Sequence, residues 1–234
     1  MNLLDPILLS LRVAGLATVI TAVLGLFLAA RLNATRSRPG RILAGGLESV
    51  ILAPMVFPPT MTGYLLLLLL GPNGPVGSLW GASGGLLFSW LAAVLASVVV
   101  SLPLMYQSAK TALTSVDPHC IAAARTLGAS ERRIFWKITV PLAWPGIAGG
   151  MALAFARAIG EFGATLMVAG NIPGATQTIP LALYSAVESG NTHAANLLLG
   201  ITVALSFAIV IVVRWSERRT AASRTHRYAG GGSR

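Results

Sequence analysis

Five stretches of the chain are apolar over roughly 20 residues or more, at 8–30, 45–70, 85–107, 141–169 and 193–214. An α-helix needs about 20 apolar residues to cross the hydrocarbon core of a bilayer. Charged residues make up only 10% of the chain, which is too few for an ordinary soluble domain of 234 residues. The sequence therefore predicts an all-α integral membrane protein with five to six spans.

Three prolines interrupt the second stretch, at positions 54, 58 and 59. A proline inside a helix removes a backbone hydrogen bond and clashes with the preceding turn, so we expect a broken helix or two short ones. Irregular backbone at membrane depth is tolerated beside protein or water, which makes this break a candidate lining of a polar pathway. A simple kink is the alternative. The candidate pathway residues are Pro58, Pro59, Thr60 and Gly63.

Basic residues occur in alternate connections between the stretches, whereas the connections 71–84 and 170–192 contain neither Lys nor Arg. Because Lys and Arg near membrane ends stay in the cytoplasm, this pattern predicts five crossings with the N-terminus outside and the C-terminus inside. Residues 1–217 would form the transmembrane domain, and 218–234 a basic, disordered cytoplasmic tail. The basic residues in question are Arg31, Arg36, Arg38, Arg41, Lys110, Arg125, Arg132, Arg133, Lys137, Arg214, Arg218, Arg219, Arg224, Arg227 and Arg234.

Several function classes do not fit the sequence. The basic residues do not follow one face as in nucleic-acid-binding proteins. Cys120 is the single cysteine, and no cluster of His, Cys or carboxylates suggests a metal or catalytic site. No Gly-rich phosphate-binding motif precedes a lysine, so an ATP-driven process would need a separate ATPase subunit. We therefore predict no catalytic residue, no metal and no cofactor held by this chain.

The cytoplasmic segment 117–138 has the pattern of two short helices. Asp117 followed by Pro118 is a helix start, and Gly128 suits a helix end or a close contact. Ser130 followed by Glu131 can begin a second helix that lasts until Pro141. The pattern alone predicts a helix-turn-helix bracket, which is either an ordinary interhelical loop or a contact surface for a soluble partner.

Arg157 and Glu161 lie deep in the fourth stretch, four residues apart and on one face of the expected helix. Charge at this depth is costly and usually faces a bundle interior, a cavity or a partner. The pair either neutralises itself and locks helices together, or Arg157 supplies positive potential along an anion path. Arg12 lies near the outer end of the first span, where it can extend to the membrane surface.

The segment around residues 121–141 resembles the cytoplasmic loop of ABC-transporter permeases of the type I importer class, which fits a cleft of the ATPase subunit. The resemblance implies that fold, a bacterial inner-membrane location and a coupling helix. One departure is Ala122, which stands where the family has an acidic residue. The ATPase-coupling residues by likeness are Ala123, Ala124, Leu127, Gly128, Ala129 and Pro141.

The segments 155–165, 171–174 and 176–180 resemble the molybdate permease branch, and the likeness extends from Asp5-Pro6 through Pro58-Pro59 to the fifth span. It implies a homodimer that imports molybdate, and also tungstate, by alternating access, with two ATPase subunits that use ATP and Mg²⁺. An external binding protein would deliver the anion. The predicted docking loop for that protein contains Asn171, Pro173, Gly174 and Thr176. A sulfate or thiosulfate permease and, from another class, a secondary anion transporter are the alternatives.

Overall fold

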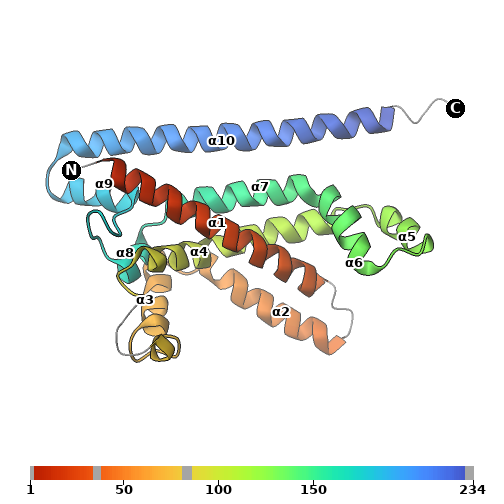
Figure 1. Ribbon diagram of the computed structural model, residues 1–234, viewed down its shortest axis with the longest axis horizontal. Helices are drawn as coiled ribbons and strands as arrows, with labels where there is room; N and C mark the ends of the chain where they lie inside the picture. The colour runs from red at the N-terminus through yellow and green to blue at the C-terminus, as the bar shows by residue number, and fades with distance from the viewer. Residues whose placement is uncertain (1–2, 34–37, 81–85, 230–234) are drawn as a thin grey trace.

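A computed structural model describes residues 3–33, 38–80 and 86–229, with side chains up to residue 211 in the last range. Long helices lie alongside one another in an elongated bundle (Figure 1). They are α1 (Leu4–Asn33), α4 (Trp90–Thr114), a continuous span of α6, η3 and α7 (Glu131–Ile159), and α10 (Thr192–Ala229). Within the described ranges every regular element is helical, which confirms the all-α prediction.

Small side chains bring the central helices together. The buried face of α1 includes Ala14 and Ala17, and α4 buries Ala92, Ala93 and Ala96. Small residues let helix backbones approach closely, and this packing is the main attraction between helices surrounded by lipid. Larger side chains of α1, such as Val23 and Phe27, are exposed on the protein surface. Helix α1 therefore turns small side chains toward the bundle and bulky ones outward, as expected for a helix that faces lipid.

The second apolar stretch is broken, as its prolines predict. Helix α2 (Arg38–Leu52) leads through a short 3-10 helix, η1 (Ala53–Met55), to α3 (Pro59–Leu70). The chain bends by 117° between the two helices, so that α3 projects away from α2 (Figure 1). Pro59 occupies the first turn of α3, where its missing amide hydrogen costs nothing.

The fourth stretch differs from its predicted bounds of 141–169. The helical span begins at Glu131 and ends at Ile159, and a separate short helix, α8 (Gly163–Ala169), follows. Four-residue α6 (Glu131–Ile134) passes through a π-helical turn, η3 (Phe135–Thr139), into α7 (Val140–Ile159). A π turn displaces the hydrogen-bond ladder, so the absent amide hydrogen of Pro141 does not end the helix. The expected second short helix before Pro141 is therefore the start of the span itself.

The C-terminal part contains more helix than we predicted. Helix α9 (Ile179–Glu188) lies within the connection 170–192, and α10 continues to Ala229. We predicted a disordered tail from residue 218, whereas α10 is helical over residues 218–229. Residues 201–229 contain neither Gly nor Pro and are rich in Ala and Arg, which are strong helix formers, so nothing in this sequence ends α10 earlier.

Candidate functional site

Glu161 lies in the break between α7 and α8 and holds the two helices in place. Its Oε2 is 2.8 Å from Nη1 of Arg157, the last basic residue of α7. Its Oε1 accepts a hydrogen bond of 2.7 Å from the amide of Ala164, in the first turn of α8. The side chain of Glu161 is 1% exposed, whereas that of Arg157 is 32% exposed. One buried carboxylate therefore pairs with a partly accessible cation and caps the next helix.

The position of this pair corrects one part of the sequence prediction. We expected Arg157 and Glu161 on one face of a continuous helix, but the helix ends at Ile159. The four-residue spacing still brings the two charges together, because the Glu161 amide donates to the Ala158 carbonyl and so extends the last turn of α7. An acid in a break can bind free amide groups that an acid within a helix cannot reach.

Helices α3 and α8 pack side by side with their N-termini at the same end. A Cβ atom at Gly63 would lie 2.8 Å from Cα of Ala164, and one at Gly163 would lie 2.9 Å from Cβ of Pro59. Both distances are too short for a side chain, so each glycine is required by the contact. The breaks that precede these two helices are therefore adjacent in space, although they are about 100 residues apart in sequence.

The predicted pathway residues thus have different surroundings. Gly63 is buried against α8, whereas Pro58, Pro59 and Thr60 at the start of α3 are exposed on the surface of the single chain. Among the described residues, the buried hydroxyls of Thr62 and Thr165 have no hydrogen-bond partner. The pathway assignment for this break remains a prediction.

The cytoplasmic helix predicted at Asp117 is present as α5 (Pro118–Thr126). The Asp117 carboxylate accepts a hydrogen bond of 2.8 Å from the amide of His119, which confirms the predicted cap. Gly128 has a φ of +77°, a left-handed conformation that favours glycine, and its amide donates to the Arg125 carbonyl. The helix therefore ends where the glycine indicated.

An ion pair closes the turn after α5. Arg125 binds Glu131 through two contacts, of 2.6 Å from Nε to Oε1 and 3.0 Å from Nη2 to Oε2. This hydrogen-bonded partner raises the pKa of Arg125 above its ordinary value, so the guanidinium stays charged. The pair fixes α5 relative to the start of α6, which makes the predicted contact segment a preformed surface.

The predicted ATPase-coupling residues divide into two groups on this surface. Leu127 is 87% exposed at the tip, and Ala123 and Gly128 are exposed beside it. Ala124 is buried against the rest of the chain, and Ala129 is half-buried. Pro141 is exposed, but it lies in the first turn of α7. Leu127 thus presents a large apolar side chain at the exposed tip of this segment.

The predicted docking loop is partly occupied by its own hydrogen bonds. The side-chain amide of Asn171 donates a hydrogen bond of 2.5 Å to Ser185 Oγ. It also accepts one of 2.9 Å from the side-chain amide of Gln177. Thr176 is buried; its hydroxyl donates to the Gly170 carbonyl and accepts from the amide of residue 172. Pro173 and Gly174 remain exposed at the tip of the loop. Asn171 and Thr176 therefore hold the loop in shape, and the exposed tip is available for contact.

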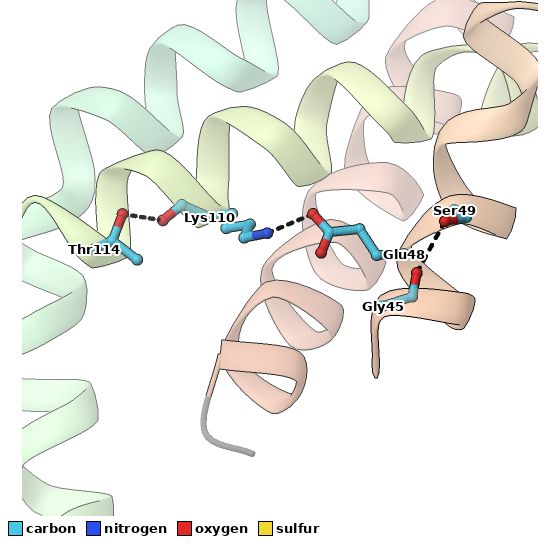
Figure 2. A network of polar contacts seen from close by, with 5 residues as sticks. All are labelled: Gly45, Glu48, Ser49, Lys110 and Thr114. Atoms are coloured by element: carbon cyan, nitrogen blue, oxygen red, sulfur yellow. Dashed lines mark hydrogen bonds and ion pairs between the residues drawn. The ribbon is translucent and has the colours of Figure 1, made fainter. Parts of the chain in front are cut away.

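Sequence reasoning missed an ion pair between α2 and α4. Glu48 of α2 contacts Lys110 of α4, as Figure 2 shows. The Lys110 ammonium also lies 5.9 Å from the ring centre of Tyr106. The sequence signal was Glu48 itself, which is the one carboxylate in the second apolar stretch and so needed a partner. This contact holds α2 to a bundle with which it shares little other packing.

Comparison with known families gives these features a context. A family described as "Binding-protein-dependent transport system inner membrane component" matches residues 3–222, nearly the entire chain. The chain belongs to this family. Its members are membrane components of transport systems, which agrees with the several long apolar helices of this chain.

Curated relatives are similar over nearly their whole length. The chain is 43% identical over 226 residues to the molybdenum transport system permease protein ModB of Escherichia coli K12, covering 93% of this chain and 96% of that protein. It is 42% identical over 211 residues to a protein of Bacillus subtilis described as a putative molybdenum transport system permease, covering 89% and 91%.

Solved structures of ABC transporters have the same fold. An inward-facing methionine ABC transporter chain superposes with a TM-score of 0.72 at 18% identity, covering 93% of this chain and 95% of that one. A bacterial ABC transporter for alginate import also gives 0.72, at 16% identity and with 92% and 79% covered. The expected type I importer permease architecture is thus confirmed at the level of the fold.

Proposed function

We propose that this chain is the membrane-spanning subunit of an ABC importer that carries molybdate, and also tungstate, into the cytoplasm. The observation that carries this proposal is the 42–43% identity to molybdenum permeases over about nine-tenths of the chain. The transporter would be a homodimer of this chain with two ATPase subunits and an external molybdate-binding protein. This chain would hold no cofactor, since ATP and Mg²⁺ belong to the ATPase.

Helix α5 is the proposed point of force transfer from the ATPase. Its exposed tip at Leu127 and Gly128 offers an apolar contact. The Arg125–Glu131 pair links α5 to the start of the helical span from Glu131 to Ile159. Movement of α5 on ATP binding would therefore be transmitted along one helix to the break at Glu161. Alternating access follows if this movement opens and closes the bundle at its outer end.

Topology follows from the basic residues. The proposed orientation has the N-terminus outside and α5 in the cytoplasm, because α5 and its neighbours carry the exposed cations Arg125, Arg132 and Arg133. The loop tip at Pro173 and Gly174 would then face the external binding protein. Its lack of Lys and Arg suits contact with a protein better than capture of a free anion.

Arg157 has a proposed role beside the anion path. About a third of its side chain is accessible, whereas its partner Glu161 is buried. The cation is thus the accessible member of the pair, and it would contribute positive potential without a net charge in the bundle.

Uptake by proteoliposomes tests this function. The chain is reconstituted with its ATPase and binding protein, ATP is enclosed, and labelled molybdate is added outside with excess tungstate or sulfate. We expect uptake that requires ATP and is blocked by tungstate but not by sulfate. Competition by sulfate would assign the chain to sulfate transport instead. Uptake without the ATPase that an uncoupler abolishes would identify a secondary transporter.

A further inference from the structure

A cavity of about 750 Å³ lies at the end of the bundle where α1 begins. Its walls come from α1, from the start of α4 and from the loop around Gly174. Arg12 of α1 lines this cavity together with Leu9 and Leu16. None of the residues assigned to ATPase coupling or to the Glu161 break contributes to it. The cavity is therefore separate from these two features, and it shares Gly174 and Thr176 with the predicted docking loop.

Arg12 is the positive charge of the cavity. Within the described parts of the chain, no carboxylate or other acceptor pairs with its guanidinium. No acidic residue lines the cavity, and the first turn of the 25-residue helix α4 adds partial positive charge at Trp90. The site therefore favours a group with negative charge.

The other polar groups in the wall are already engaged. The Ser89 hydroxyl donates a hydrogen bond of 2.6 Å to the carbonyl of Leu86, and the Thr176 hydroxyl donates one to the carbonyl of Gly170. A free divalent oxyanion needs donors on several sides to replace its water, and the single planar guanidinium of Arg12 supplies them from one side only. The remaining wall is apolar and includes Leu16 and Trp90.

The depth of Arg12 also limits what it can reach. Helix α1 has 30 residues and is about 45 Å long, compared with about 30 Å for the hydrocarbon core of a bilayer. Arg12 lies about 12 Å from the start of α1, which is a few ångströms below the expected hydrocarbon boundary of a centred helix. An arginine at this depth extends toward the level of lipid phosphates.

We propose that this cavity is a phospholipid site, in which Arg12 binds the headgroup phosphate and an acyl chain lies against Leu9, Leu16 and Trp90. The site would take a lipid of the outer leaflet, a placement that rests on the proposed topology. Phosphate binding itself does not depend on molybdate transport. A bound lipid would join α1, α4 and the loop tip at Gly174, the three parts of the wall.

Native mass spectrometry of the purified full chain tests the proposal. The protein in detergent is titrated with dioleoyl phosphatidylglycerol and, separately, with dioleoylglycerol, which has the same acyl chains but no phosphate. We expect a phosphatidylglycerol adduct that Arg12→Gln weakens about fivefold, the factor that corresponds to about 1 kcal/mol for one basic residue at a membrane surface. Dioleoylglycerol should bind weakly to both proteins.

Two further variants separate this site from general attraction to lipid. Arg133→Gln removes another exposed, unpaired arginine, near the opposite end of the bundle, and should leave the adduct unchanged. Ala175→Phe keeps Arg12 but fills part of the cavity, and it should weaken the adduct as well. Equal loss in Arg12→Gln and Arg133→Gln would overturn the assignment to this cavity.

Other occupants give different results. Quenching of Trp90 fluorescence by free phosphate or molybdate, lost in Arg12→Gln, would assign the cavity to a free oxyanion and overturn the lipid proposal. Weaker binding of the external binding protein to Arg12→Gln, with the phosphatidylglycerol adduct retained, would overturn it in favour of a protein contact. Loss of the adduct with molybdate uptake unchanged would still support the lipid site and leave the proposed function intact.

Discussion

Replacing Arg157 with glutamine isolates the contribution of the Glu161 pair. The Glu161 carboxylate is 1% exposed, and it contacts the Arg157 guanidinium and the Ala164 backbone amide. Removing the partner of a buried charge costs about 3–5 kcal/mol. Since a third of the Arg157 side chain is exposed and water can reach its position, we expect the lower end of this range, about 3 kcal/mol.

The double variant Arg157→Gln, Glu161→Gln should recover most of this loss. Its glutamine at position 161 carries no charge, and the amide oxygen can still accept the hydrogen bond from Ala164. Thermal unfolding of the purified protein in detergent measures the effect. We expect a Tm on the order of 5 °C or more lower for the single variant, since about 3 kcal/mol is lost, and a Tm near that of the wild type for the double variant.

Molybdate uptake by the same two variants decides the role of the cation. If the double variant is stable and transports, Arg157 serves the structure of the break. If it is stable but inactive, the positive charge is needed for the anion. An unchanged Tm in Arg157→Gln alone would refute the reasoning, because it would mean that the buried carboxylate does not depend on its partner.

Three more predictions concern other contacts. Gly128→Trp should prevent co-purification of the ATPase subunit. Gly128→Ala introduces the same backbone strain at φ +77° but little bulk, and most of the ATPase subunit should still co-purify with it. Gly63→Leu should lower thermal stability by about 1–3 kcal/mol through overpacking against α8, whereas Gly45→Ala, with nothing within 4 Å, should not. Lys110→Met should leave Glu48 unpaired and increase proteolysis of α2, and restoration by a second change, Glu48→Gln, would identify the pair as the cause.

The outcomes that contradict these predictions are equally specific. Full ATPase binding by Gly128→Trp would remove α5 from the docking surface. An unchanged Tm for Gly63→Leu would mean that α3 and α8 can separate at no cost. Protection of α2 in the lysine variant would show that apolar contacts, rather than the charge pair, hold this helix.

The sequence predicted the features that depend on neighbouring residues. The prolines at 54, 58 and 59 indicated the broken second span, Asp117 indicated the start of α5, and Gly128 indicated its end. In each case the cause is local, because a missing amide, a capping carboxylate or a left-handed residue acts within a turn or two of its own position.

The remaining features depend on contacts between distant segments or on departures from the ordinary helical repeat. The break at Gly160 and Glu161 has no proline to mark it, and it is stabilised by an ion pair and a cap. Pro141 suggested a boundary, but the π turn before it lets the helix continue. The Glu48–Lys110 pair joins residues 62 positions apart, and hydropathy gives no indication of which cation pairs with the half-buried Glu48.

The close contacts of Gly63 with α8 and of Gly163 with α3 make these two helices one rigid unit. Because Gly63 and Gly163 leave no room between the two backbones, neither helix can tilt without carrying the other. At its N-terminal ends the unit is joined to α2 through the proline break and to α7 through the Glu161 break, and both of its helices also pack against α4. A movement of α7 would therefore be passed to α3 through α8, without passing through α2.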